Sequence, residues 1–146
     1  MPTKQYRQWH DAQVWTHVFF VPGLVCSFST LPELCLILSV VCALSIANHV
    51  NYERDGLLSM VEGVAAKSLY VYGVAQLCHR PSQLAFMIEI MCFGWTTTTF
   101  LVTLALDLYN TSRTLWDFYH PLGMHVVPAV WVLVTAASHP PLLAGL

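Results

Sequence analysis

Charged side chains are scarce in this sequence. Only 10% of its 146 residues are Asp, Glu, Lys or Arg, whereas 56% are hydrophobic. Soluble domains carry about 25% charged residues, so six basic and eight acidic side chains cannot cover the surface of a soluble domain of this size. The chain contains no basic stripe, which argues against nucleic acid as a partner. The composition therefore predicts an integral membrane protein.

Disulfide and zinc-finger patterns are also missing. The chain has five cysteines, an odd number, with neither CxxC nor Cys/His finger spacing. Their positions in or at the ends of apolar runs predict small packing residues rather than a disulfide framework. The first residues lack the basic-then-apolar form of a signal peptide, so we expect residues 1–12 to form a polar N-terminal tail. The cysteines are Cys26, Cys35, Cys42, Cys78 and Cys92.

The sequence does contain a series of long apolar segments. A helix that crosses the hydrocarbon core needs about 20 residues. Five segments approach this length, and they are too long and too uniform for β-strands. We therefore predict an all-α fold: a polytopic transmembrane helical bundle of about five spans over residues 13–138, followed by a C-terminal tail over 139–146. The expected spans are about 13–30, 32–50, 56–78, 83–108 and 119–138.

Basic residues are distributed unevenly between the two sides of such a bundle. The side that holds the N-terminus, here called side A, carries four of the basic residues outside the spans, and the other side carries one. By the positive-inside rule, side A faces the cytoplasm or, in a mitochondrial membrane, the matrix. The first segment contains Pro22 and Gly23, so a bent or re-entrant segment is an alternative to a full crossing. The basic residues are Lys4, Arg7, Arg54 and Arg113 on side A and Arg80 opposite.

Several ionisable residues fall at the side-A ends of the expected spans. Four histidines share this depth, and Glu62 lies less than two turns into the third span. Ser45 precedes His49 by one helical turn on the same face. Ionisable residues within spans are costly and usually face the bundle interior with a partner. The pattern predicts a buried polar site near side A. The histidines are His17, His49, His120 and His125.

Three chemistries fit such a set of histidines. Three imidazoles can hold Zn²⁺ with a fourth position open, and a nearby carboxylate and hydroxyl can then move a proton and stabilise an oxyanion. Alternatively, His17 or His49 can pair with His125 as the axial ligands of a b-type haem. The third interpretation is ordinary packing at the membrane interface, where the polar tip of histidine meets water.

Four stretches of the chain resemble one family of membrane proteins. They are "FFVPGLVCSFSTLPEL", "LSIANHVN", "MVEGVAAKSLYVYGVAQL" and "DFYHPLGMHVVPAVWVLV". Together they resemble the CREST superfamily, and most of all its myomaker-like members. That superfamily includes alkaline ceramidases and other lipid hydrolases, and its members have seven spans around a zinc ion held by three histidines. The resemblance implies that His49, His120 and His125 bind Zn²⁺, and that Ser45 and Glu62 take the places of the family's serine and aspartate.

The sequence departs from the family pattern at its last histidine pair. The family has His-x-x-x-His, whereas His120 and His125 are one residue further apart. A regular α-helix would turn these two rings about 140° from each other. Pro121 suits the first position of a helix, so we expect it to start the last span and to leave His120 outside, free to bend inward. The chain also has about five spans instead of the family's seven, which predicts a shortened member.

The leading functional prediction is a zinc-dependent membrane hydrolase that cleaves an amide or ester bond in a lipid. In this interpretation membrane lipids are the partners, Glu62 handles the proton and Ser45 assists the oxyanion. The small size and short loops also fit a non-catalytic structural subunit of a larger membrane complex, for example a respiratory one. A haem-binding membrane subunit is the remaining alternative. The sequence leaves the lipid and the organelle open.

Overall fold

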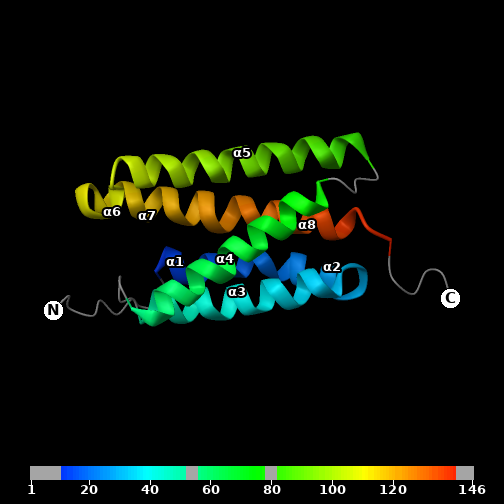
Figure 1. Ribbon diagram of the computed structural model, residues 1–146, viewed down its shortest axis with the longest axis horizontal. Helices are drawn as coiled ribbons and strands as arrows, with labels where there is room; N and C mark the ends of the chain where they lie inside the picture. The colour runs from blue at the N-terminus through cyan, green and yellow to red at the C-terminus, as the bar shows by residue number, and fades with distance from the viewer. Residues whose placement is uncertain (1–10, 52–55, 78–81, 141–146) are drawn as a thin grey trace.

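The computed structural model describes residues 11–51, 56–77 and 82–140, and every secondary-structure element within these ranges is a helix (Figure 1). The predicted all-α class is therefore confirmed for the described chain. Most of the two expected tails, 1–12 and 139–146, lies outside the described residues. The elements are α1 Ala12–Trp15, η1 Thr16–Phe20, α2 Val21–Thr30, α3 Pro32–Val50, α4 Leu57–Gln76, α5 Gln83–Ala105, α6 Leu108–Thr111, α7 Arg113–Pro121, η2 Leu122–Val126 and α8 Val127–Ala137.

Three helices of the described chain are long and apolar enough to cross a membrane. They cover Pro32–Val50, Gln83–Ala105 and Thr114–Ala137, the last formed by α7, η2 and α8 without a break. At about 1.5 Å per residue, a helix of 19 residues, the shortest of the three, is close to the thickness of the hydrocarbon core. These helices indicate a membrane protein. The first expected span is divided into α1, η1 and α2, and α4 covers most of the third.

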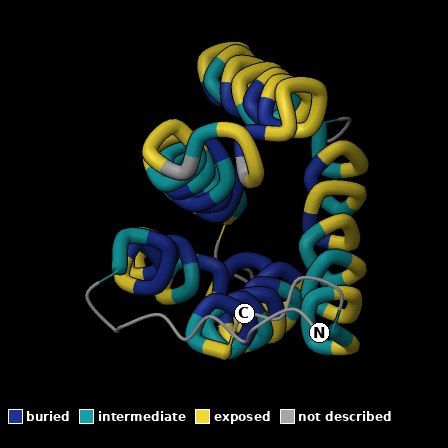
Figure 2. The backbone as a smooth tube through the Cα atoms, turned by 90° about the vertical axis from the view of Figure 1, so that its left-hand side faces the viewer, coloured by how far each residue is buried: buried dark blue, intermediate teal, exposed yellow. Residues whose placement is uncertain are grey.

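The helices form two layers with α4 across them. Helix α5 and the continuous α7–η2–α8 helix run side by side in one layer, and α2 and α3 form an antiparallel pair in the other (Figure 1). Seen along the long axis, α4 stands at the side of both layers (Figure 2). Residues of α3 and α8 form most of the apolar core between the layers, with Leu34, Leu38, Val132 and Ala136 fully buried, and partly buried residues of α2 pack against it.

Small residues allow close contact between the layers. A Cβ atom added at Gly23 of α2 would lie 2.6 Å from Cγ1 of Val132 in α8, which is closer than two carbon atoms can approach. Only a residue without a side chain can therefore stand at this position unless Val132 moves. Packing of this kind, with small residues at the contact, is typical of helices that associate within a membrane.

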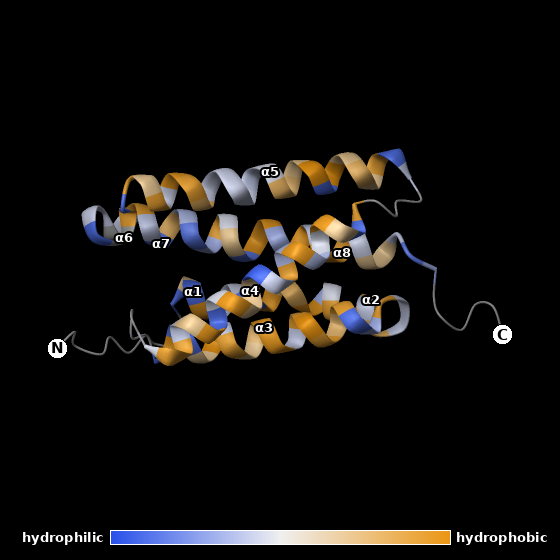
Figure 3. Ribbon diagram, viewed as in Figure 1, coloured by the Kyte–Doolittle hydropathy of each residue, from blue (hydrophilic) through white to orange (hydrophobic). Residues whose placement is uncertain are grey.

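The outer surface is apolar, and part of the interior is polar. Phe28, Leu57 and Met91 are each more than 70% exposed, and orange hydrophobic residues recur along the long helices (Figure 3). In contrast, Glu89 is completely buried, and its carboxylate accepts a hydrogen bond of 3.1 Å from the hydroxyl of Thr135. A membrane protein requires this arrangement, because lipid solvates apolar side chains and polar groups must find partners inside the bundle.

Candidate metal centre

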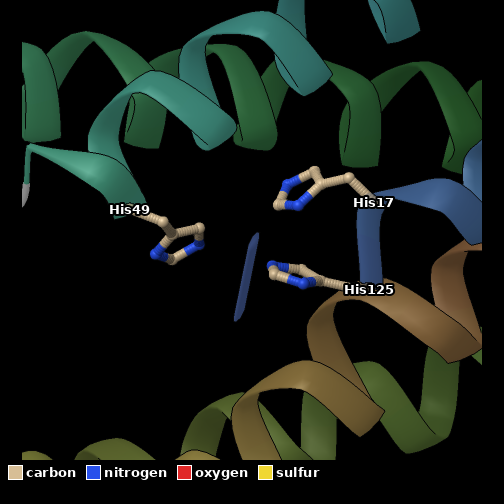
Figure 4. Close-up of side chains that lie close together, drawn as sticks. All are labelled: His17, His49 and His125. Atoms are coloured by element: carbon tan, nitrogen blue, oxygen red, sulfur yellow. The ribbon is translucent and has the colours of Figure 1, made fainter. Parts of the chain in front are cut away.

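Three histidines from three different elements converge inside the described part of the bundle. His17 comes from η1, His49 from the last turn of α3, and His125 from η2, and all three side chains are buried (Figure 4). Each ring offers a nitrogen atom such that the three nitrogens lie within 4.8 Å of one another. The ring centroids of His17 and His125 are 4.3 Å apart, and that of His49 lies 5.8 Å and 5.3 Å from them. This group can hold a metal ion.

The coordination geometry of a bound zinc ion determines how close the nitrogens of the three histidines must come to one another. Zinc binds imidazole nitrogen at about 2.0–2.1 Å, and a tetrahedral site then separates its nitrogen ligands by about 3.4 Å. The three nitrogens lie within 4.8 Å of one another, so their separations must shorten by at most about 1.4 Å for all three to bind one ion.

The ring of His17 is oriented by its own helix. Its Nδ1 atom lies 3.0 Å from the carbonyl oxygen of Val14. A carbonyl only accepts hydrogen bonds, so Nδ1 carries the proton and Nε2 carries the lone pair. Nε2 is buried and has no hydrogen-bond partner among the described residues. A buried lone pair without a donor is costly, and a metal ion would satisfy it.

The ring of His125 is oriented by Thr16. The Thr16 hydroxyl donates its single proton to the carbonyl oxygen of Ala12, and the same oxygen lies 2.7 Å from Nδ1 of His125. Because that proton is already used, Nδ1–H of His125 must be the donor in the second hydrogen bond. Nε2 of His125 is then also unprotonated. Hydrogen bonds of this kind to the second ring nitrogen are the rule for metal-binding histidines, and they fix the tautomer and the ring orientation.

The hydrogen bonds that link His125 through Thr16 to Ala12 give a testable prediction. Thr16→Val keeps the shape of the side chain but removes the oxygen that accepts from His125 Nδ1. The apparent affinity for Zn²⁺ should fall about 10–100-fold, as is usual when an outer hydrogen-bond partner of a ligand is lost. Competition with a chromophoric chelator in detergent solution measures the affinity. Thr30→Val is the matched control, because Thr30 is also buried and bonds only to the Cys26 carbonyl of its own helix. Equal affinity for Zn²⁺ in the Thr16 variant and the wild type would contradict the role of Thr16 in orienting His125 as a ligand.

The structure places the two predicted catalytic residues together. Ser45 is buried on α3, one turn before His49, and its side chain lies beside that of Glu62 of α4. Glu62 is half-buried. The packing of α3 against α4 therefore brings a carboxyl group next to the hydroxyl that precedes His49 by one helical turn. Whether they take part in a reaction stays a prediction.

The fourth predicted histidine, His120, lies beside the group. Its ring centroid is 5.3 Å from that of His49 and 5.2 Å from that of His125, with both contacts edge to face. The ring also stacks on Trp116, one turn earlier in α7, at 4.5 Å. The close group of nitrogens includes His17 instead of His120. The sequence predicts His17 at the same depth but outside the ligand set, because only its position along the span, and no motif, indicates it.

The last helix corrects one expectation. Pro121 does not begin a helix: it lies inside the continuous helix from Arg113 to Ala137, so His120 is helical as well. The segment Leu122–Val126 is a π-helix, in which hydrogen bonds join residues five apart. Residues five apart therefore share a face, which is why the rings of His120 and His125 meet despite the long spacing. Pro121 lacks the N–H of a regular helix, and such breaks in the ladder favour a local change of this kind.

An apolar cavity borders the centre. It has a volume of about 310 Å³ and opens between η1, α2 and α3. Its lining is mostly apolar, and His17 is the one lining residue that belongs to the histidine group. The four cysteines of the described chain are free, and Cys42 contributes to this lining as a small apolar residue. The other lining residues include Val14, Val18, Val21, Leu24 and Ile46.

Comparisons with known proteins add no homologue. No protein-family model matches the chain, and neither a curated protein nor a solved structure matches it. The function must therefore be inferred from the centre itself.

Proposed function

We propose that this protein is a multi-pass membrane hydrolase that holds Zn²⁺ with His17, His49 and His125 and cleaves an amide or ester bond in a membrane lipid. The observation that carries the proposal is the buried convergence of three imidazoles, two of which have Nδ1 protonated and Nε2 left to bind. Ionisable side chains at such depth mark functional sites in membrane proteins. The resemblance of the sequence to CREST hydrolases supports zinc and a lipid substrate.

The ligand set favours zinc among the available metals. Imidazole suits Zn²⁺, Cu²⁺, Fe²⁺ and Ni²⁺, whereas Mg²⁺ and Ca²⁺ prefer oxygen ligands. Three protein ligands with one open position are the usual arrangement of catalytic zinc. When bound, the ion would polarise the scissile carbonyl group and activate a water molecule.

The chain's own residues supply the remaining steps of a hydrolysis. In this proposal the Glu62 carboxylate takes a proton from the attacking water and returns it to the leaving group. The Ser45 hydroxyl, which lies beside Glu62, donates a hydrogen bond to the oxyanion that develops at the carbonyl oxygen. His17, His49 and His125 would hold the ion that polarises the carbonyl group.

The surroundings of the site support an apolar substrate. The cavity beside His17 has a volume of about 310 Å³, near the lower end of the range for ligand sites. Its apolar lining suits a hydrocarbon segment next to the bond to be cleaved. Substrate would enter from the membrane, and membrane lipids are accordingly the proposed partners.

The proposal includes a topology of about five spans, with the N-terminus on the cytoplasmic or matrix side. The consecutive elements α1, η1 and α2 would form the first crossing and α4 the third. In this arrangement the histidine group lies near the side-A face. The excess of basic residues on side A supports the orientation.

A substitution of the proposed base tests the catalytic part. Glu62→Gln should leave the zinc content unchanged and lower the hydrolysis of a responsive lipid amide or ester by about 10²–10⁴-fold, the usual contribution of a general base. Zinc is measured by elemental analysis of the purified protein, and hydrolysis by mass spectrometry of lipid panels in nanodiscs. Glu33→Gln is the control, because Glu33 is exposed on α3 and accepts a hydrogen bond from Tyr72.

Three outcomes would reject the proposal. Purified protein without stoichiometric zinc would remove the metal centre. Zinc without hydrolysis of any lipid in the panel would favour a structural subunit instead. A Soret absorbance band would assign the histidines to haem.

A further inference from the structure

A fourth imidazole stands next to the proposed metal centre. The distances of His120 to His49 and His125, 5.3 Å and 5.2 Å between ring centroids, match the 5.3 Å between His49 and His125 themselves. The ring of His120 is therefore as close to these two ligands as they are to each other. It nevertheless lies outside the group whose nitrogens approach within 4.8 Å.

The position of His120 is held from the other side by Trp116. The two rings are nearly parallel, at 28°, with centroids 4.5 Å apart. Both residues belong to α7, one turn apart. His120 is half-buried, whereas His17, His49 and His125 are buried. Of the four imidazoles, His120 thus has the most space in which to rotate, and it rests on an aromatic surface at the edge of the site.

The helix geometry directs His120 toward the same centre as His125. The π-helix over Leu122–Val126 brings residues five apart onto one face. The ring of His120 therefore lies between Trp116 and the two histidines His49 and His125, within about one ring's width of each.

We propose that His120 is a displaceable fourth ligand of the metal centre. This inference rests on the proposed zinc site of His17, His49 and His125. With metal bound and no substrate present, His120 leaves Trp116 and fills the fourth position. Zinc with four protein ligands is closed, whereas catalytic zinc keeps one position open. The return of His120 to Trp116 opens that position to substrate, so the stack of His120 on Trp116 is the open state of the site.

Cobalt substitution separates the two states. Co²⁺ replaces Zn²⁺ in such sites, and its visible spectrum changes when an exogenous anion joins the coordination sphere. In full-length protein, azide should leave the spectrum of the wild type unchanged and shift that of His120→Ala, in which the fourth position is open. Metal stoichiometry should be the same in both, with the affinity lowered about 10–100-fold in the variant.

The control variant is His139→Ala. His139 is half-buried beyond the end of α8, with Nδ1 2.8 Å from the Thr135 carbonyl oxygen, and it belongs to no group of metal-binding residues in the described chain. Its Co²⁺ spectrum should be insensitive to azide, like that of the wild type. An azide response in the wild type equal to that of His120→Ala would overturn the inference.

A second variant changes Trp116, on which His120 stacks, instead of His120 itself. Trp116→Leu removes the aromatic surface but leaves all four histidines in place. His120 should then remain on the metal for longer, so the release of metal to excess chelator should slow relative to the wild type. Unchanged or faster release would contradict an exchange between Trp116 and the metal. This variant keeps the inference testable if His120→Ala does not fold.

The same measurements distinguish failure of this inference from failure of the proposed metal centre. If the wild type binds no Zn²⁺ or Co²⁺, both fail together. If metal binds and is lost on removal of His17, His49 or His125, but azide behaves alike with and without His120, only the role of His120 is rejected.

Discussion

Replacing His125 by Ala is expected to abolish stoichiometric binding of Zn²⁺. His125 contributes one of the three converging nitrogens, and its ring lies closest to that of His17. With His125 removed, only two of the converging imidazoles remain, and His120, which lies outside the converging group, does not hold the ion against a chelator in its place. Elemental analysis of the purified full-length protein after dialysis against a weak chelator measures the loss. His17→Ala and His49→Ala should have the same effect, because the three ligands act on one ion.

The matched control for the ligand variants is again His139→Ala. This histidine lies outside the converging group, so its loss should leave one zinc ion per chain. The helical content of each variant, measured by circular dichroism in the same detergent, shows whether it has folded. Full zinc content in folded His125→Ala would disprove the assignment of His125 as a metal ligand.

Replacing Gly123 by Ala is expected to disturb both the fold and the metal centre. A Cβ atom at Gly123 would lie 2.7 Å from both Cβ and Oγ1 of Thr99 in α5. The added methyl group therefore forces η2 away from α5, and overpacking of this kind lowers the free energy of unfolding by about 1–3 kcal/mol. His125 follows Gly123 by two residues in the same π-helix, so the shift also moves a ligand. We expect weaker zinc binding together with a lower temperature of thermal unfolding.

Gly94→Ala provides the comparison for this substitution. Gly94 also lies in a helix of the bundle, α5, and a Cβ atom added there meets nothing within 4 Å. Its variant should unfold at the wild-type temperature or above, because Ala is the better helix former. If Gly123→Ala and Gly94→Ala behave alike in thermal unfolding and zinc binding, close packing of η2 on α5 does not position His125.

The two substitutions report on different levels of the protein. His125→Ala removes a ligand but leaves the apolar core, formed mostly by α3 and α8, in place. Gly123→Ala leaves every ligand present and changes only the contact that positions one of them. If both lower zinc binding, but only Gly123→Ala lowers the unfolding temperature of the metal-free protein, ligand chemistry and ligand placement are separated.

The sequence by itself determined the all-helical class and the membrane character of this protein. Long apolar runs without alternation leave the helix as the structure that satisfies every backbone group in lipid. It also placed four histidines at one depth, because depth follows from the position of a residue along a span. The pairing of Ser45 with His49 on one face follows from the helical repeat alone. These are local properties, and a local pattern is enough to predict them.

Only the tertiary structure decided which imidazoles converge and which nitrogen each one offers. His17 joins His49 and His125 because η1 packs against both α3 and η2, and no spacing along the chain encodes that contact. The tautomer of His125 depends on Thr16, which is 109 residues away in the chain. The sequence predicts that a helix starts at Pro121. In the structure the helix continues through Pro121, and the π-helical segment that follows brings His120 beside His125. Ring direction is set by packing between elements, and this information is absent from the periodicity of any one element.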